Sequence, residues 1–325
     1  MIEYFPVVLL SAYLLDLILG DPQWFPHPVR LIGKLIRLLE NFFRSLGTSP
    51  PWLKFSGILL AFIVCGSTFG ITYLAIRMAG LFFWVAGLIC SIFFAYTVLS
   101  IRDLHVETRK VLLALEDGDL RLARKELSFI VGRDTADLDS PAILRALVET
   151  IAENISDGVI APFFYLGLGG PSWAMTYKAV NTLDSMVGYK NERYRHIGWA
   201  SARMDDAANF IPARLSGLII VLSSLFLRKP WMDSWRILMR DRGKHESPNS
   251  TWPETAMAGA LGVRLGGLNY YFGQPSQKPF IGDPKKELAF ADVREAWKIL
   301  YLSSFWMLLF SLLLAWAARD FFYWR

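Results

Sequence analysis

Cysteine and charge are both scarce in this chain. Of its 325 residues, only Cys65 and Cys90 are cysteines, and both lie in uncharged apolar stretches. A disulfide framework or a zinc site needs more ligands in polar surroundings, so we interpret both cysteines as small core residues. Charged residues make up only 19% and hydrophobic residues 54% of the chain, whereas soluble domains carry about 25% and about 45–50%. This composition favours an integral membrane protein.

Motifs for nucleotides and nucleic acids are lacking as well. The sequence contains neither the P-loop pattern GxxxxGK[ST] nor a GxGxxG pattern that opens a helix. Its net charge of +5 comes without a basic tail or a basic-aromatic alternation, so we expect no nucleic-acid partner. The four histidines show no metal-binding spacing. The N-terminus lacks the basic region of a signal peptide, so we expect the first apolar block to be retained.

Long apolar runs, in contrast, are plentiful. A membrane-spanning helix needs about 20 mostly apolar residues. Three uncharged runs meet this length: Phe55–Ile76, Met78–Ile101 and Ile299–Ala318. Tyr4–Gly20 is shorter and contains Asp16, but we still expect a membrane helix there. Leu215–Leu227 is interpreted either as a short span or as an interfacial helix.

One apolar run is interrupted. Gly158–Tyr177 is uncharged but contains Pro162, the pair Gly169-Gly170 and Pro171. Such breaks suit a re-entrant or discontinuous segment that lines a cavity, because the freed backbone groups need partners. The sequence therefore predicts an all-α polytopic membrane protein with about four to six membrane helices. We expect residues 1–325 to form a single integral-membrane domain, with residues 158–177 as its re-entrant or broken segment.

The distribution of Lys and Arg predicts the sides of the membrane. Lys and Arg are frequent in residues 21–54, 102–157 and 228–299. The turn expected at Arg77, in contrast, has almost no other basic residues. The positive-inside rule then places 102–157 and 178–299 largely in the cytoplasm. Residues 178–210 join that side only if Gly158–Tyr177 is re-entrant. We prefer that topology because it gathers all the polar motifs on one face.

The first polar motif is GDPQWFPHPVRLIG, Gly20–Gly33. Prolines flank His27 and prevent a regular helix there, so the loop presents Asp21, His27 and Arg30 directly after an apolar helix. An equally weighted interpretation is a stiff interfacial turn, in which Trp24 and Phe25 anchor the chain among lipid headgroups.

The second motif is GRDTADLDSPAILRALVETIAENISDG, Gly132–Gly158. Ser140 is expected to cap a helix that has Pro141 at its first position. A polar stripe then recurs at every fourth residue, which places its members on one helix face, and Asn154 lies beside it. Carboxylates one turn apart can hold a divalent cation, but an ordinary amphipathic helix would give the same pattern. The stripe consists of Arg145, Glu149, Glu153 and Asp157.

The third motif spans Tyr177–Arg214. Lys178, Asn181 and Asp184 share a helix face, and Asp205 and Asp206 precede Asn209 at helical spacing. Carboxylate and amide oxygens suit Mg²⁺, which also binds substrate phosphates. Basic side chains of this segment could neutralise phosphates; they are Lys178, Lys190, Arg193, Arg203 and Arg214. A basic loop that fixes topology would explain these cations, but not the two aspartates with Asn209.

The fourth motif spans Lys244–Gly267. Glu254 opens a stretch of small residues that ends in Gly266-Gly267. Small residues allow close backbone approach, although plain helix packing has the same composition. His245 titrates nearest neutral pH, yet a lone loop histidine is commonly just exposed.

Together these motifs resemble the CobD/CbiB family of cobalamin-biosynthesis membrane proteins, the adenosylcobinamide-phosphate synthases. The resemblance covers essentially the whole chain, since the motifs occur in the family's order from Gly20 to Gly267. The last string is the least stringent of them. The matching strings are GDPQWFPHPVRLIG, IVGRDT, ETIAENISDGVIAPFFY, YKAVNTLDSMVGYKNERYRHIGWASARMDDAANFIPARL and SPNSTWPETAMAGALGVRLGG.

The resemblance implies an ATP-dependent amide ligase. The family joins (R)-1-aminopropan-2-ol O-phosphate, or free aminopropanol, to the f-side propionate of adenosylcobyric acid, giving adenosylcobinamide phosphate or adenosylcobinamide. A carboxylate and an ammonium group do not react directly, so the carboxylate needs activation, which ATP with Mg²⁺ supplies. ATP and Mg²⁺ are implied by the family and have no motif in the sequence. The expected partners are these substrates, membrane lipid and other corrin-pathway enzymes, at the cytoplasmic face of the cell membrane.

Within that reaction, residue chemistry predicts three sets of site residues. Candidate proton acceptors are Glu149, Asp157 and His245. Candidate metal ligands are Glu153, Asp205 and Asp206. Candidate ligands of substrate or phosphate are Asp21, His27, Arg30, Arg133, Asn154, Lys178, Asn181, Asp184, Lys190, Arg193, Arg203 and Asn209.

Other classes of function share some of these features. A transporter of corrinoids would show internal repeats and polar residues at the bilayer midplane, whereas the polar motifs here lie in connecting segments. A lipid-headgroup transferase would need an arginine shortly after Asp157-Gly158, and Val159–Phe164 contains none. A scaffold for other corrin enzymes stays open. The enzyme hypothesis requires the polar stretches near Asp21, Glu153, Asp184, Asp206 and His245 to converge in one pocket.

Overall fold

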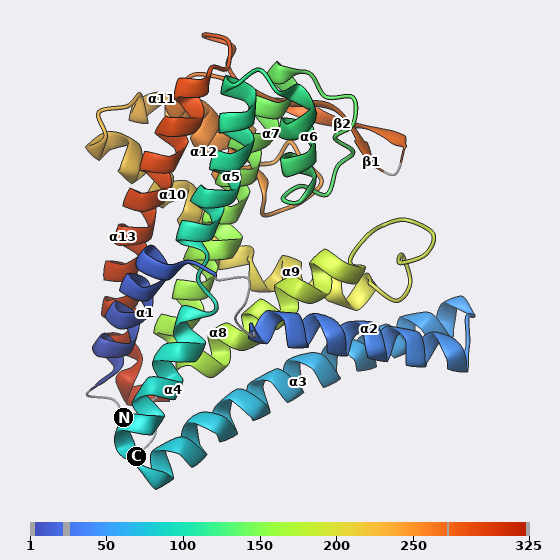
Figure 1. The fold of residues 1–325 in the computed structure, drawn as a ribbon, viewed down its shortest axis with the longest axis vertical. Helices are drawn as coiled ribbons and strands as arrows, with labels where there is room; N and C mark the ends of the chain where they lie inside the picture. Colours follow the sequence, from blue (N-terminus) through green and yellow to red (C-terminus); the bar gives the residue numbers. More distant parts are fainter. Residues whose placement is uncertain (1–3, 22–26, 272, 323–325) are drawn as a thin grey trace. The chain divides into compact units, whose positions relative to one another are not determined.

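The computed structural model describes residues 4–21, 27–271 and 273–322 (Figure 1). These form two compact units. Unit 1 comprises Met1–Ser100, Ala161–Asn209 and Leu308–Arg325, and unit 2 comprises Ile101–Ile160 and Phe210–Met307. The last helix, α13 (Phe290–Phe322), contributes to both units. The prediction of a single integral-membrane domain stays a prediction.

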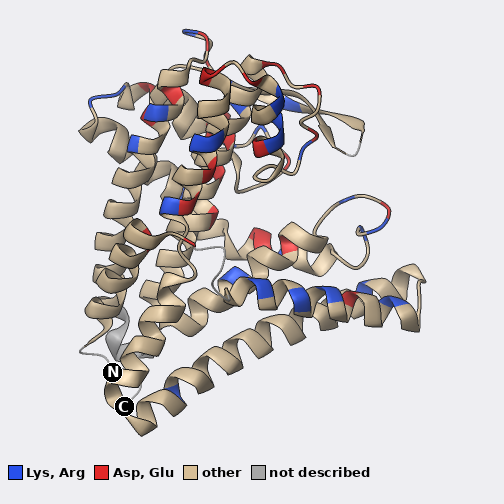
Figure 2. Cartoon of the chain, in the orientation of Figure 1, with Lys and Arg blue, Asp and Glu red and all other residues tan. Residues whose placement is uncertain are grey.

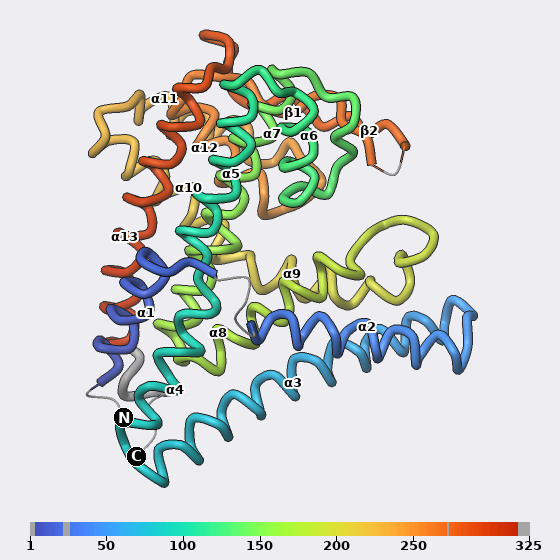
Figure 3. The backbone as a smooth tube through the Cα atoms, viewed as in Figure 1, coloured from blue at the N-terminus to red at the C-terminus, as the bar shows by residue number. Residues whose placement is uncertain are grey.

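Unit 1 is built from helices around the long helix α3. Its elements are α1 (Phe5–Leu19), α2 (Pro28–Leu46), α3 (Pro50–Phe82), α4 (Trp84–Tyr96), α8 (Ala161–Val187) and α9 (Trp199–Ala208). Helix α3 packs against α2, α4, α8 and α9. Figure 2 shows few charged residues along α3, and Figure 3 shows α2 running beside it. The uncharged run from Phe55 explains why α3 forms an apolar helix.

Unit 2 combines short helices with one β-hairpin. Its helices are α5 (Ile101–Glu116), α6 (Leu120–Ser128), α7 (Ser140–Asn154), the π-helical turn η2 (Ile155–Ile160), α10 (Phe210–Phe226), α11 (Trp231–Asp241) and α12 (Thr251–Leu261). Strands β1 (Arg264–Tyr271) and β2 (Gln274–Gly282) pair antiparallel. The buried helix α12 packs against α7, α10, α11 and both strands, so it forms the centre of this unit.

The expected membrane character is confirmed. Within the part of the chain that the structure describes, three helical stretches are long and apolar enough to cross a bilayer: Pro50–Phe82, Trp84–Glu116 and Phe290–Ala317. A fourth span is possible if α9 and α10, which meet at a bend of 46°, are counted as one. Only 33% of the most apolar window of α3 is buried, so most of that surface is left for lipid. The block Tyr4–Gly20 forms α1, which is apolar but has only 15 residues.

Three local predictions were wrong. No turn lies at Arg77, because α3 continues to Phe82, with the Arg77 guanidinium 5.9 Å from the ring centre of Tyr73. The cap of α7 is Asp139, not Ser140, since the Asp139 carboxylate accepts a hydrogen bond from Ala142 N at 2.9 Å. The stretch Arg240–Pro253, for which the Gly, Ser, Pro and Asn content predicts a loop, is not all loop, because α11 extends to Asp241 and α12 begins at Thr251.

The interruption of the Gly158–Tyr177 run is confirmed. Gly170 has φ 76° and ψ −167°, which breaks the helical path of α8 just before Pro171. A left-handed φ suits glycine, and proline cannot continue the hydrogen-bond ladder. Residues 158–160 belong to η2 of unit 2, and residues 161–177 belong to α8 of unit 1. The re-entrant topology and the cytoplasmic placement of 102–157 and 178–299 stay predictions.

Candidate functional site

Polar side chains gather in two clusters, one in each unit. The unit 2 cluster consists of Arg133, Glu149, Glu153, His245, Glu254 and Lys278. The unit 1 cluster consists of Tyr177, Asn181, Asp184, Asp205, Asp206 and Asn209.

A buried ion pair lies at the base of the unit 2 cluster. Arg133 Nη2 is 2.6 Å from Glu149 Oε2, and the two side chains are only 7% and 2% exposed. Arg133 Nη1 also donates to Asn269 Oδ1 at 2.7 Å, and Gly266 N donates to Glu149 Oε1 at 2.9 Å. Buried charges are tolerated when they are paired and hydrogen-bonded in this way. Both oxygens of Glu149 are engaged, which favours a positioning role over proton transfer.

The backbone conformation of β1 explains why the Gly266 N–H can donate a hydrogen bond to Glu149. Gly266 and Gly267 have φ values of 87° and 98°, and the strand register shifts between Leu265 and Gly267. Only glycine adopts such φ values at low cost. The resulting bulge presents the Gly266 N–H to the carboxylate of Glu149 on α7. The polar stripe of α7 therefore faces the hairpin, which sequence reasoning did not predict.

Glu254 is the least satisfied buried carboxylate of unit 2. It is 1% exposed and lies 3.3 Å from His245 Nδ1. No hydrogen bond of good geometry from any described residue reaches either of its oxygens. Burial alone would lower the pKa of His245, but the ion pair with Glu254 outweighs burial and raises that pKa. His245 Nε2 lies 3.0 Å from Pro279 O of β2. A buried carboxylate in this state attracts a cation or a hydrogen-bond donor.

Lys278 brings a positive charge to the same cluster from β2. It forms no ion pair with any described residue. Burial alone would lower the pKa of Lys278, but the carboxylates of Glu254, Glu153 and Glu149 raise it. Lys278 is therefore held as an ammonium ion among three carboxylates without direct pairing.

Glu153 completes the cluster from the last turn of α7. The surrounding protein raises its pKa by desolvation, although the side chain keeps an accessible surface. The Lys278 charge opposes this rise, and the Glu254 charge adds to it. The cluster thus offers an accessible carboxylate, a buried carboxylate and an ammonium group that lies among them. Such an arrangement can bind a small molecule that carries charges of both signs.

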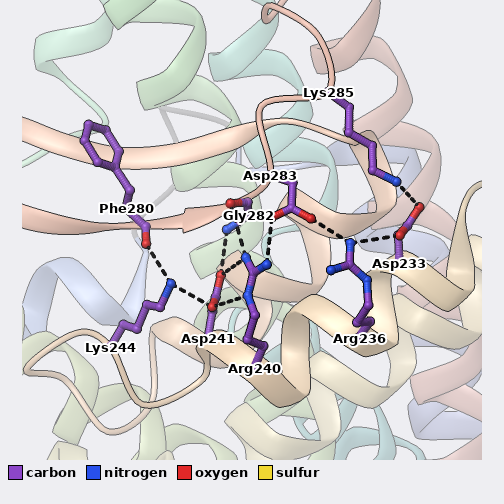
Figure 4. Close-up of polar contacts among 9 residues, drawn as sticks. All are labelled: Asp233, Arg236, Arg240, Asp241, Lys244, Phe280, Gly282, Asp283 and Lys285. Atoms are coloured by element: carbon purple, nitrogen blue, oxygen red, sulfur yellow. Dashed lines mark hydrogen bonds and ion pairs between the residues drawn. The ribbon is translucent and has the colours of Figure 1, made fainter.

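A network of ion pairs fixes the end of β2 near this cluster (Figure 4). Asp241 is fully buried, and its carboxylate receives two hydrogen bonds from Arg240 at 2.7 and 2.8 Å. It also accepts Gly282 N at 2.9 Å and lies 2.7 Å from Lys244 Nζ. Arg240 Nη1 extends the network to Asp283 at 2.7 Å.

Further pairs tie the same strand end to α11. Arg236 lies 2.6 Å from Asp283, and Lys285 lies 2.6 Å from Asp233 (Figure 4). Lys244 Nζ also donates to Phe280 O at 3.3 Å. Lys244 and Asp241 therefore anchor strand β2 directly on the side that follows Lys278 and Pro279, whereas Lys285 lies beyond the end of the strand.

The unit 1 cluster is a chain of polar contacts between α8 and α9. Tyr177 Oη donates to Asn209 Oδ1 at 2.9 Å, and Asn209 Nδ2 donates to Asp205 Oδ2 at 3.0 Å. Asn181 lies near the same carboxylate, but no hydrogen bond of good geometry from a described residue reaches Asp205 Oδ1. That oxygen is buried and free to bind a cation or a donor.

Asp184 joins this cluster from α8. Burial, and next the carboxylate of Asp206, raise the pKa of Asp184 to about 6. The electrostatic repulsion between two neighbouring carboxylates is reduced when a cation binds to them. Among the described residues, however, no group of three or more His, Cys, Asp or Glu side chains is arranged to hold a metal ion. Of the predicted metal ligands, Asp205 and Asp206 lie in unit 1 and Glu153 lies in unit 2.

The first polar motif has a clear structural role. His27 caps α2, because its Nδ1 accepts a hydrogen bond from Val29 N at 3.3 Å. His27 Nε2 lies 3.2 Å from Asp21, and Arg30 is exposed on the first turn of α2. Trp24 and Phe25, the predicted headgroup anchors, lie outside the described residues.

The remaining predicted residues are spread over both units. Arg193 lies 3.6 Å from Glu40 of α2, and Arg203 lies 3.6 Å from Asp206 at an exposed position. Asn154 Nδ2 donates to Thr150 O within its own helix. Lys178 and Lys190 belong to unit 1, and Asp157 belongs to η2 of unit 2. Convergence of all the polar stretches in one pocket stays a prediction.

Sequence reasoning missed two residues of the unit 2 cluster and its surroundings. Lys278 lies in a segment, QPSQKPFIG, that reads as a polar loop, and Asn269 lies beside glycines. Glu254 was noted only as the start of a small-residue stretch. Its position one turn into a helix without other charges was the available signal, because a charge among small apolar residues is costly unless it has a function.

Comparison with known proteins identifies relatives along nearly the whole chain. Residues 9–300 match the family model described as CobD/Cbib protein. The cobalamin biosynthesis protein CobD of Geobacter metallireducens is 53% identical over 294 residues, which cover 90% of this chain and 92% of the relative. The protein of the same name from Clostridium perfringens is 48% identical, with coverage of 92% and 94%. That of Klebsiella pneumoniae is 46% identical, with coverage of 90% and 92%. No solved structure matches the chain. The chain therefore belongs to the CobD/CbiB family.

Proposed function

We propose that this chain is a membrane enzyme of cobalamin biosynthesis. The reaction is formation of an amide between the amino group of (R)-1-aminopropan-2-ol O-phosphate, or of aminopropanol, and the f-side propionate of adenosylcobyric acid. The names of the relatives support the pathway. The observation that carries the chemistry is the unit 2 cluster, in which the Lys278 ammonium group lies among the carboxylates of Glu153 and Glu254 without an ion pair to any described residue.

The cluster matches the charges of the amine substrate. An aminopropanol phosphate carries an ammonium group at one end and a phosphate at the other. Glu254 and Glu153 would bind the ammonium group, and Lys278 would bind the phosphate through charge-assisted hydrogen bonds. Arg133 is already occupied by Glu149 and Asn269, so we assign it to positioning of Glu149 and β1.

His245 is the proton acceptor in this proposal. The substrate ammonium must lose a proton before its nitrogen can attack a carbonyl carbon. His245 lies 3.3 Å from Glu254, beside the carboxylate that would hold the ammonium group. Only neutral imidazole accepts a proton, and Glu254 raises the pKa of His245. The reaction should therefore speed up as pH rises through that pKa.

The unit 1 cluster would hold Mg²⁺ and the phosphates that come with it. Asp205 fits this role because Oδ1 is buried without a hydrogen bond from any described residue, and Asp206 and Asp184 add negative charge. Mg²⁺ commonly uses one or two carboxylates plus substrate phosphates, so two aspartates suffice. When bound, ATP with Mg²⁺ supplies activation of the substrate carboxylate. We further propose that this chemistry takes place at the cytoplasmic face of the cell membrane.

The proposal is tested with the purified full chain in proteoliposomes. The reaction mixture contains adenosylcobyric acid, aminopropanol phosphate, ATP and Mg²⁺. The corrinoids are then separated by chromatography, and their masses are measured by mass spectrometry. We expect a new corrinoid whose mass equals the two substrates less one water, formed only with nucleotide. Accumulation of unchanged corrinoid inside the vesicles would instead identify a transporter and contradict the proposal.

A further inference from the structure

Helix α2 of unit 1 presents three faces of different chemistry. The first face is packed against protein: Ile32, Ile36 and Phe43 are at most 6% exposed, and α2 contacts α3 and α8. Its single acidic residue, Glu40, is also turned inward and is only 5% exposed. Arg44 Nε lies 2.9 Å from Glu40, so this face carries no excess of negative charge.

The second face is basic and open. Lys34 and Arg37 are exposed and, at i and i+3, lie on one side of the helix. Neither forms an ion pair or hydrogen bond with a side chain elsewhere in the described ranges. Asn41 continues this row one turn further along. Two cations are thus exposed without an ion-pair partner among the residues that the structure describes.

The third face is apolar and equally open. Leu31, Leu38, Phe42 and Leu46 are between 52% and 64% exposed. Their spacing of seven, four and four residues places them in one stripe beside the basic row. Large apolar side chains that are open over four turns mark a surface that another apolar phase covers.

The neighbouring helix indicates what that phase is. Only three residues separate the end of α2 from Pro50, where α3 begins. The exposed Phe55 and Phe62 of α3 belong to a candidate membrane span. The apolar stripe of α2 therefore adjoins a lipid-facing surface. Four charged residues besides Arg30 lie within the 19 residues of α2, so α2 does not cross the bilayer. A helix of this kind lies in the plane of the membrane surface.

We propose that α2 lies in the membrane–water interface and that Lys34 and Arg37 bind the phosphate groups of anionic phospholipids. The apolar stripe enters the acyl chains at the headgroup boundary, and the basic row faces the headgroups beside it. Figure 2 shows that α2 carries several Lys and Arg residues. Lipids with a net negative charge should bind more tightly than zwitterionic lipids. The phosphate of a zwitterionic lipid is already neutralised by the cation of its own headgroup, whereas the phosphate of an anionic lipid can pair with Lys34 or Arg37. This inference is independent of the proposed reaction.

The test measures lipid selectivity of the full chain purified in neutral detergent. Native mass spectrometry follows binding of phosphatidylglycerol and, separately, phosphatidylcholine. We expect tighter binding of phosphatidylglycerol to the wild type. The double variant Lys34→Gln/Arg37→Gln should lose about fivefold in affinity for each removed charge, roughly 25-fold in all, with phosphatidylcholine unaffected.

A matched control removes the same charge elsewhere. Arg121 and Lys125 are exposed on α6 of unit 2, and the variant Arg121→Gln/Lys125→Gln should keep the wild-type preference. An equal loss in both double variants would mean that net charge alone attracts the lipid, which overturns a site on α2. All four replaced side chains are exposed, so melting temperatures should match that of the wild type.

A second measurement places α2 directly. With Cys65 and Cys90 replaced by alanine, spin labels are attached to Leu38→Cys and Asn41→Cys in vesicles of phosphatidylcholine with phosphatidylglycerol. The label at 38 should be more accessible to oxygen and the label at 41 to a water-soluble nickel complex. Two labels of equal accessibility, or spin–spin coupling that shows a second copy of the chain on this face, would contradict the proposal.

Discussion

Arg133 and Glu149 form a buried ion pair of 2.6 Å that joins the segment after α6 to helix α7. Glu149 also accepts the backbone N–H of Gly266, so the pair connects this segment to β1 as well. Three parts of unit 2 that are distant in sequence therefore meet at one carboxylate. The cluster with Glu153, Glu254 and Lys278 is built on this junction.

The first prediction concerns removal of one partner of this pair. Arg133→Ala leaves the Glu149 charge buried without its cation, and loss of one member of a buried pair costs about 3–5 kcal/mol. We expect a clear drop in the melting temperature of the detergent-solubilised protein. Arg121→Ala, at an exposed position, should change stability by less than about 0.5 kcal/mol. Equal melting temperatures for the two variants would show that the pair does not stabilise the fold.

The second prediction concerns pH. Glu254 raises the pKa of His245, so His245 stays protonated to a higher pH than a free histidine, whose pKa is about 6.5. The pair therefore stabilises the fold below that pH, and this contribution is lost as pH rises through the folded-state pKa. Turnover, which needs neutral His245, should rise over the same interval. In Glu254→Gln the rise should move to lower pH, and a pH–rate profile that does not move would exclude His245 as the acceptor.

The third prediction concerns the anchor of β2. Burial alone would raise the pKa of Asp241, but hydrogen bonds from Arg240, Lys244 and Gly282 lower it. Asp241→Ala leaves the Gly282 N–H without its acceptor and Arg240 and Lys244 without their shared partner. Because both cations are 41% exposed, we expect a loss of about 1–3 kcal/mol in unfolding free energy. Asp233→Asn, in a more exposed pair, should cost no more than about 1 kcal/mol. Thermal unfolding compares the two, and a ranking in the opposite order would contradict the role of Asp241.

The fourth prediction concerns the proposed metal ligands. Asp205→Asn and Asp206→Asn should each lower turnover by about 100-fold or more, because a catalytic cation contributes several kcal/mol to the transition state. The Mg²⁺ concentration for half-maximal rate should rise in both variants, while membrane insertion is unchanged. Asp117→Asn, at an exposed turn, serves as the control. Wild-type turnover and Mg²⁺ dependence in both Asp205 and Asp206 variants would remove the metal assignment.

Much of the fold was predictable because it depends on local patterns. The uncharged run Phe55–Ile76 specifies an apolar helix whatever surrounds it, and Gly170-Pro171 breaks a helix through the chemistry of those two residues. The helix end near Arg77 was mispredicted because a long side chain can lie along its own helix, over Tyr73. Charge position alone therefore does not mark the end of a span.

The sites were predictable only where their contacts are local. Asp205 and Asn209 are one helical turn apart, and the structure shows the hydrogen bond that this spacing allows. Tyr177 joins them from α8, which no local spacing indicates. Lys278 reaches the unit 2 cluster only because β2 pairs with a bulged β1. Long-range strand pairing and the φ values of Gly266 and Gly267 cannot be read from hydropathy or i, i+4 patterns.

The most direct test of the proposed function is a titration of aminopropanol phosphate with Lys278→Gln, next to wild type and Lys285→Gln. Lys285 is exposed and pairs with Asp233, so its replacement removes the same charge away from the cluster. Loss of a charge-assisted hydrogen bond of about 1.5–3 kcal/mol corresponds to roughly 10- to 150-fold in kcat/KM. We predict that loss for Lys278→Gln, with wild-type kinetics for Lys285→Gln. Unchanged kinetics in Lys278→Gln, with the amide product still formed, would contradict the assignment of the substrate to the unit 2 cluster.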